Sequence, residues 1–100
     1  MKAIIDNLSK ALESRVRLAA MSILMVNESM DFNTLKEMLQ VTDGNLATHM
    51  SVLEREGYIR VQKRFVGKKP QTTYVATGTG KAAFTEHVDA LERLIRAGRP

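Results

Sequence analysis

Residues 42–70, TDGNLATHMSVLEREGYIRVQKRFVGKKP, decide the fold of this chain of 100 residues. The first half of this stretch has the spacing of an amphipathic helix, because Leu46, Met50 and Leu53 fall within one narrow arc of a helical wheel. Thr42 stands where an N-cap is expected. Asn45 follows three residues later, at the position whose side chain pairs with the cap in a capping box. Gly57 can end the helix because glycine readily adopts positive φ. The pattern predicts a helix over residues 43–56.

Two runs with the character of strands follow this helix. In residues 58–65, Ile59 and Val61 alternate with polar side chains, and residues 71–76 form the second run. Between them lies VGKKP, residues 66–70, in which Gly67 and Pro70 favour a turn. The second half of the stretch therefore predicts a β-hairpin.

The flanking segments are predicted to be helical, apart from a short strand at residues 30–32. Apolar spacing indicates a first helix over about residues 4–10, and Ser14 is placed to cap RVRLAAMSILMV, residues 15–26. Asn33 is expected to cap a helix that ends near Leu39, and Thr77 to cap a final helix over residues 78–97. The predicted order is helix, helix, strand, helix, helix, strand, strand, helix.

Two short helices joined by a tight turn, with a hairpin directly after the second, form a helix-turn-helix with a wing. We therefore expect a mainly α fold with a small β-hairpin (α+β), namely a winged helix-turn-helix with a three-helix core and a long C-terminal dimerisation helix. The length fits one domain. Its winged-helix core is expected at residues 12–77, with the dimerisation helix at residues 78–97, assisted by residues 1–12.

Positive charge is concentrated in one segment. Residues 57–85 contain no Asp or Glu but hold six basic side chains, whereas the rest of the chain holds 9 basic and 11 acidic ones, out of totals of 15 and 11. The net charge of +4 is thus +6 in this segment and −2 elsewhere. Such a local excess is typical either of a solvated basic surface or of an element that binds phosphates.

The predicted helix over residues 43–56 carries small and hydrogen-bonding side chains opposite its apolar arc. A helix that enters the major groove needs such a face, although an ordinary surface helix also has a solvated polar side. The basic side chains of the hairpin favour the first interpretation, since as phosphate contacts they would supply affinity and register. The candidate DNA-binding residues of the helix are Thr42, Gly44, Asn45, Thr48, His49, Ser51, Val52 and Arg55, and those of the wing (residues 60–72) are Lys63, Arg64, Lys68, Lys69, Gln71 and Thr72.

A resemblance to a known family rests on the run FNTLKEMLQVTDGNLATHMSVLEREGYIRVQKRFVGKKPQTTYVATGTGKAAF, residues 32–84. This run resembles small single-domain winged-helix transcriptional regulators of the MarR/ArsR-like superfamily, and Thr-Asp-Gly-Asn-Leu corresponds to the opening of their recognition helix. RVRLAAMSIL upstream also fits, so the resemblance covers about residues 12–94. It implies a dimer with helix 43–56 in the major groove and the 65–70 wing beside it. Ala76 departs from the pattern, which usually has leucine before the threonine.

Dimerisation is also expected from unpartnered apolar faces. The final helix has a stripe about four turns long, and the first segment adds further apolar side chains that a chain of this size can hardly cover alone. The alternative is that each packs within its own domain. The candidate dimerisation residues are Ile4, Ile5, Leu8, Phe84, Val88, Leu91 and Ile95. Two recognition helices roughly 34 Å apart would match half-sites on one face of a duplex.

Several kinds of site are not expected. The chain has no Cys, which excludes disulfides and thiolate chemistry. Residues 78–83 satisfy G-x-G-x-x-A, but no parallel strand follows, so no nucleotide cofactor is expected. The two histidines lack the spacing of a metal sensor. His49 is expected to contact phosphate or base, and His87 to be a solvated or interface residue. No grouping of a nucleophile with a base indicates an enzyme.

The function expected from the sequence is sequence-specific binding of double-stranded DNA as a homodimeric transcription regulator, with repression favoured. The alternative is a winged-helix module that docks an acidic protein. No membrane-length apolar run and no signal peptide are recognised, so a cytoplasmic protein is expected. Nothing in the sequence indicates a small-molecule effector.

Overall fold

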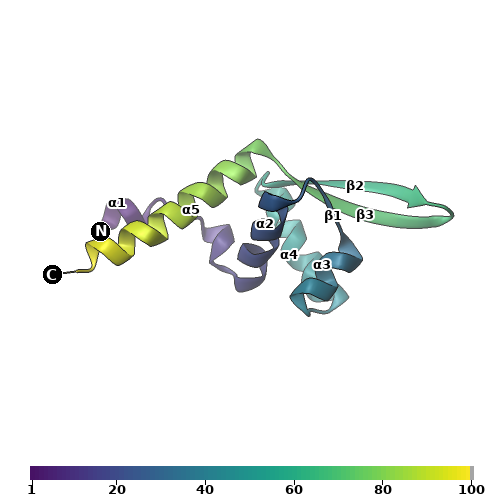
Figure 1. Ribbon diagram of the computed structural model, residues 1–100, viewed down its shortest axis with the longest axis horizontal. Coiled ribbons are helices and arrows are strands. Elements are labelled where there is room, and N and C mark those ends of the chain that lie inside the picture. Colours follow the sequence, from purple (N-terminus) through teal and green to yellow (C-terminus); the bar gives the residue numbers. More distant parts are fainter. Residues whose placement is uncertain (100) are drawn as a thin grey trace.

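The computed structural model describes residues 1–99. Its elements are, in order, α1 (Lys2–Ile5), the 3₁₀ turn η1 (Lys10–Glu13), α2 (Arg15–Val26), β1 (Met30–Asp31), α3 (Phe32–Leu39), α4 (Asp43–Arg55), β2 (Ile59–Val66), β3 (Lys69–Ala76) and α5 (Gly78–Ala97). The molecule measures 60 × 25 × 21 Å, because α5 projects from one end of a helical body and the β2–β3 hairpin from the other (Figure 1). This is the mainly α, winged-helix architecture that the sequence predicted.

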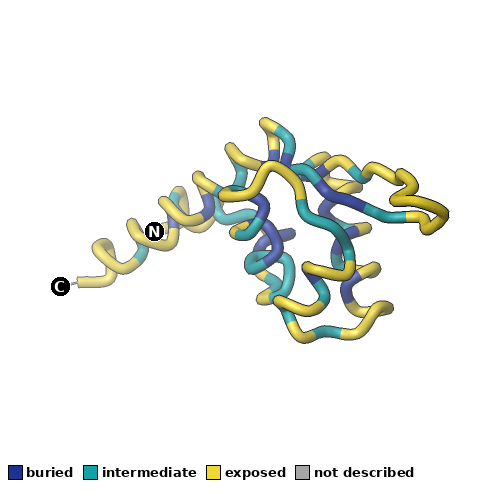
Figure 2. Tube along the Cα trace, turned by 45° about the vertical axis from the view of Figure 1, so that its right-hand side comes forward, coloured by how far each residue is buried: buried dark blue, intermediate teal, exposed yellow. Residues whose placement is uncertain are grey.

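The core lies where α2, α3 and α4 meet the inner half of the hairpin (Figure 2). Leu24, Leu35 and Leu53 are fully buried, one from each helix, and Ile59 and Tyr74 close the core from the sheet. Removing one such side chain from water stabilises the fold by roughly 1.5–3 kcal/mol. The apolar arc of α4 predicted from the sequence is confirmed, since Leu46, Met50 and Leu53 are all buried.

Three helix starts were predicted correctly from their capping residues. In each, the side-chain hydroxyl accepts a hydrogen bond from a backbone N–H in the first turn of the helix, which satisfies a donor that has no partner inside the helix. The pairs are Ser14 Oγ with the N–H of Arg17 (3.3 Å), Thr42 Oγ1 with that of Asn45 (3.1 Å) and Thr77 Oγ1 with that of Gly80 (3.0 Å).

The predicted cap of α3 was wrong. Asp31, not Asn33, is the N-cap, and its carboxylate accepts hydrogen bonds from the backbone N–H (3.0 Å) and the hydroxyl (2.6 Å) of Thr34. These hydrogen bonds, that of the Thr34 hydroxyl first, lower the pKa of Asp31. Phe32 consequently belongs to α3, and β1 has only two residues, which pair with Tyr74 and Thr73 of β3.

The predicted first helix over residues 4–10 is also wrong. Helix α1 ends at Ile5, and Ser9 has an extended backbone (φ −84°, ψ 121°) before η1 begins. The cause is tertiary, since Ser9 N–H donates to Nδ1 of His87 in α5 (2.9 Å) and Ser9 Oγ lies 3.0 Å from the hydroxyl of Tyr58. These contacts draw the chain out of the helical path that its apolar spacing favours.

The hairpin is longer and its turn tighter than predicted. The sheet is antiparallel with the order β1-β3-β2, and β2 pairs with β3 from Ile59↔Ala76 to Val66↔Lys69. Only Gly67 and Lys68 remain in the turn, and Gly67 supplies a φ of 65°, which suits the first position of a two-residue hairpin turn. Pro70 lies within β3, beyond the two residues that pair with β1, so its missing N–H is tolerated there.

Within residues 1–99, no helix has both the length and the apolar character that crossing a membrane requires.

Candidate nucleic-acid interface

One face of helix α4 packs in the core, and the opposite face is exposed to solvent. The predicted contact residues Gly44, Thr48, Ser51 and Arg55 are all exposed on the side opposite the buried arc. Thr42 and Asn45 are exposed at the start of the helix, whereas Val52 is half-buried. Thr48 donates its hydroxyl proton to the carbonyl of Gly44 (2.9 Å), which leaves the lone pairs of that hydroxyl free to accept. The exposed side chains are small or polar, as close approach to base edges requires.

The connection between α3 and α4 is held at both sides. Gln40 ends α3 in the left-handed conformation (φ 55°), and its N–H donates to the carbonyl of Lys36. The ammonium of Lys36 then lies 2.7 Å from the carboxylate of Asp43 in the first turn of α4. An exposed ion pair contributes at most about 1 kcal/mol, so this one adds little to the stability of the connection.

His49 is tied to the body of the protein. Its Nδ1 accepts a hydrogen bond from Nη1 of Arg17 (2.9 Å), and Nε of the same guanidinium donates to the carbonyl of Ala11 (2.6 Å). Arg17 thereby joins η1, α2 and α4. Partial burial first, and the positive charge of Arg17 second, lower the pKa of His49. The sequence does not predict this contact, because Arg17 and His49 lie 32 residues apart on different helices.

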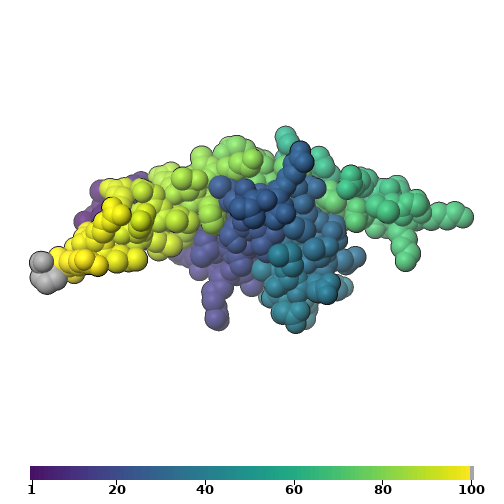
Figure 3. Space-filling model, viewed as in Figure 1, coloured from purple at the N-terminus to yellow at the C-terminus, as the bar shows by residue number. Residues whose placement is uncertain are grey.

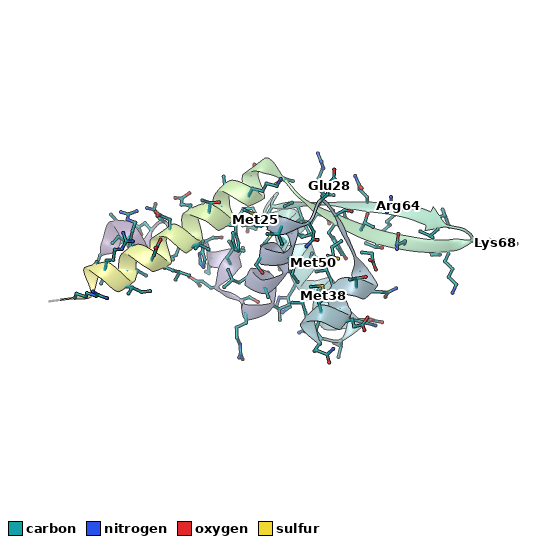
Figure 4. The ribbon with its side chains drawn as sticks, in the orientation of Figure 1. Met25, Glu28, Met38, Met50, Arg64 and Lys68 are labelled. Carbon is teal, nitrogen blue, oxygen red and sulfur yellow. The ribbon has the colours of Figure 1, made fainter. Side chains whose placement is uncertain are left out.

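The outer half of the hairpin carries its cations into solvent. Lys63, Arg64, Lys68 and Lys69 are exposed, and no carboxylate among residues 1–99 forms an ion pair with them. Gln71 and Thr72 of the predicted wing are half-buried. Figure 4 shows Arg64 on the projecting part of the hairpin and Lys68 at its tip, far from Met50 in the helical body. This half of the hairpin is therefore an accessible cationic arm.

A shallow groove of about 290 Å³ separates α4 from the hairpin. Ser51 and Glu54 line it from the helix, Lys63 and Thr72 from the strands, and Tyr74 lies at the sheet side. Burial first, and the negative charge of Glu54 second, raise the pKa of the Tyr74 phenol. The groove brings the exposed flank of α4 and the inner end of the cationic arm together on one side of the molecule.

The predicted dimerisation residues divide into two groups. Phe84 packs against the core of its own chain. Ile4, in the helix α1 that packs against α5, and Leu8, which follows α1, are half-buried. Four others are exposed, namely Ile5 (50 %), Val88 (43 %), Leu91 (39 %) and Ile95 (68 %). Helix α5 thus keeps an apolar stripe open to solvent in the part that projects beyond the helical body (Figures 1 and 3).

His87 is not the solvated or interface residue that the sequence predicted. It is buried, and its Nδ1 accepts the hydrogen bond from the N–H of Ser9. Within residues 1–99, no three His, Asp or Glu side chains are grouped closely enough to hold a metal ion. The partner of His87 lies 78 residues away in the sequence, so spacing along the helix does not predict it.

Comparison with known proteins adds to this geometry. The sequence profile of the family described as winged helix DNA-binding domain matches residues 16–95. An uncharacterised protein of Methanocaldococcus jannaschii is 34% identical over 79 residues, which are 79% of this chain and 86% of that protein.

Solved structures share the fold. The transcriptional regulator homologue from Pyrococcus horikoshii OT3 superposes with a TM-score of 0.83 at 29% identity, over 96% of this chain and 93% of that one. Sco3205, a MarR family transcriptional regulator from Streptomyces coelicolor solved in complex with DNA, gives a TM-score of 0.68 at 18% identity, over 99% and 68% of the two chains. The winged-helix DNA-binding family predicted from the sequence is confirmed by the family profile, and the MarR and ArsR regulators among the solved structures share its fold.

Proposed function

Because this chain belongs to the family of winged helix DNA-binding domains, we propose that it is a dimeric, sequence-specific transcription repressor. In this proposal α4 reads base edges in the major groove, and the hairpin contacts the neighbouring backbone or minor groove. The observation that carries it is that two surfaces meet at one groove, which Ser51 lines from the exposed polar face of α4 and Lys63 from the inner end of the cationic arm. One surface has the chemistry of base readout and the other that of phosphate binding.

Within α4, Arg55 is the residue with the strongest capacity for discrimination. It is exposed on the outward face, and a guanidinium can donate two hydrogen bonds to one guanine. Thr48 and Ser51 would add shorter contacts. The cations of the hairpin would supply affinity for every sequence, because phosphates are the same at each base pair.

The dimer in this proposal forms through the exposed apolar stripe of α5 together with Ile5 of α1. We expect Ile95→Glu to yield monomers in analytical ultracentrifugation, because it places a charge in that stripe. Thr85→Glu is the matched control, since it adds the same charge at an exposed position of α5 outside the stripe. Equal sedimentation of the two variants would contradict this part of the proposal.

The test of DNA binding is selection of bound fragments from a genomic pool, followed by a salt series on the selected duplex. With about two to four phosphate contacts from each wing, a dimer should give a log–log salt slope of roughly −4 to −7. Arg55→Ala should change the selected sequences, not only the affinity. Weak, salt-insensitive binding, or capture of one stoichiometric acidic protein with no DNA selected, would refute the proposal and favour a docking module.

A further inference from the structure

The end of the hairpin carries two large apolar side chains in solvent. Phe65 is 74 % exposed and Val66 is 57 % exposed, next to the turn at Gly67 and Lys68. Neither contributes to the core, and the binding of phosphates by cations gives them no role. Their position at the tip of the arm calls for a physical explanation.

The register of the hairpin decides which way Phe65 faces. Phe65 is paired with Pro70, and because side chains alternate along a strand it shares its face with Val61 and Lys63. Val61 packs against the core, and Lys63 lines the groove beside α4. Phe65 and Pro70 therefore continue the groove face of the hairpin past α4. Pro70 is exposed beside a small hollow that Phe32 and Asn33 of α3 also line. Phe65, its partner in β2, is 74 % exposed. Val66 lies on the opposite face.

The surroundings of this apolar tip are cationic. Arg64, Lys68 and Lys69 flank it, all of them exposed, and residues 57–85 contain no carboxylate. An apolar group inside a ring of positive charge complements a surface that is negative outside and apolar within. A DNA duplex has this character in its minor groove, where phosphates line the rim and stacked bases form the interior.

The arm holds Phe65 in a defined place. Both strands are paired up to the two-residue turn, so Phe65 lies in a regular strand and not in a loop. An aromatic ring on such an arm loses little conformational entropy when it binds. In Figures 1 and 3 the arm projects well past α3 and α4, which gives it the reach to meet a second groove of a duplex bound along α4.

We propose that Phe65, supported by Pro70, is a wedge that enters the minor groove, partly unstacks one base step and bends the duplex. This proposal rests on the proposed DNA-binding function and adds to it a source of specificity. Pyrimidine–purine steps such as TA open most easily, so the protein would select a TA step at the position of Phe65 by its deformability, without hydrogen bonds to the bases.

The experiment uses a duplex of about 30 base pairs selected by the protein, with a donor and an acceptor fluorophore at its ends. A series of duplexes carries a single TA step, shifted one base pair at a time through a flank that otherwise lacks TA. Bending is read from energy transfer, unstacking from 2-aminopurine placed at the step, and affinity from titration. Phe65→Ser removes the wedge, Phe65→Leu keeps an apolar one, and Val66→Ser is the matched control on the opposite face.

We expect the wild-type protein to raise energy transfer and to prefer one TA position by about fivefold to tenfold over an AA step. Phe65→Ser should abolish both effects while unfolding like the wild type, because the ring is exposed, and Phe65→Leu and Val66→Ser should retain them. Tight binding without bending, or bending that survives in Phe65→Ser, would overturn the wedge and leave DNA binding intact. Failure of the wild type to bind any duplex would overturn both proposals.

Discussion

The two halves of the β2–β3 hairpin differ sharply although they belong to the same two strands. In the inner half, Ile59 is 2 % exposed and Tyr74 4 %, whereas in the outer half Phe65 is 74 % exposed. The register is continuous through both halves, and Ile59 and Phe65 lie on the same face. What changes is only what lies beneath the sheet, because the helical body ends part of the way along the strands (Figure 2).

One regular element thus contributes to the core at one end and leaves its other end exposed. The same division runs around α4, where Leu46, Met50 and Leu53 are buried and the opposite face is exposed. Changes on the buried parts should therefore reduce the free energy of unfolding, and changes on the exposed parts should affect DNA binding alone. The predictions below test this separation.

The largest effect on stability is expected from Ile59→Ala in the inner half of the hairpin. Loss of a buried isoleucine should lower the free energy of unfolding by about 2–5 kcal/mol, because apolar contacts disappear and a cavity remains. Urea denaturation followed by circular dichroism measures it. Val66→Ala in the outer half is the control and should change the value by no more than about 0.5 kcal/mol. Comparable losses in the two variants would abolish the distinction between the halves.

The double variant Lys68→Glu, Lys69→Glu at the tip is expected to lose affinity for DNA but to keep its stability. Its free energy of unfolding should match that of the wild type, because both side chains are exposed and unpaired among residues 1–99. Its affinity for every duplex should fall by about 100-fold, with a less negative salt slope, since phosphate contacts are lost and repulsion is added.

The matched control for this variant is Lys10→Glu, Arg99→Glu. It makes the same change of net charge at exposed positions outside the hairpin. If the control loses less affinity, the loss in the tip variant comes from the position of Lys68 and Lys69 on the hairpin and not from net charge. Equal losses would mean that net charge alone governs binding, and the wing would have no special role.

A smaller loss of stability is expected where the inner end of the hairpin meets α5. Gly80 lies against the backbone of Tyr58, and a Cβ at Gly80 would collide with the carbonyl oxygen of that residue. Gly80→Ala should lower the free energy of unfolding by about 1–3 kcal/mol, because α5 must shift away from the sheet. A Cβ at Gly78 in the same helix meets nothing within 4 Å, so Gly78→Ala should cause no loss and should stabilise the helix by up to about 1 kcal/mol, because helices favour Ala over Gly. Equal thermal melting of the two variants would contradict this account.

Local signals predicted most of the fold. Apolar spacing predicted α4 and α5, and the hydroxyl caps at Ser14, Thr42 and Thr77 predicted the starts of α2, α4 and α5, because both signals act within a few residues. The exposed face of α4 and the cationic arm followed from the same patterns. Whether these candidate residues contact DNA stays a prediction.

Two failures were local, namely the cap of α3, which is Asp31 and not Asn33, and the length of the hairpin turn. The other failures were contacts between distant parts of the chain. The helix expected over residues 4–10 ended early because Ser9 bonds to His87 and Tyr58, and the role of His49 was incomplete because its partner Arg17 lies on another helix. The exposure of Phe65 could not be predicted either, since it depends on where the body beneath the strand ends. Sequence periodicity carries no information on these distances.

The smallest effect is expected at His49, on the border between the two faces of α4. Its pKa is lowered in the folded protein, chiefly by partial burial and then by Arg17, so the unfolded chain binds a proton more readily. The free energy of unfolding should therefore be constant above the ordinary histidine pKa of about 6.5 and decrease as the pH falls through that value. His49→Asn keeps an acceptor for Arg17 but does not titrate, and every other ionisable group is unchanged. As the pH is lowered from about 7.5 to about 5, the urea midpoint of this variant should thus fall less steeply than that of the wild type. Identical profiles would show that the environment of His49, including its contact with Arg17, does not govern its protonation.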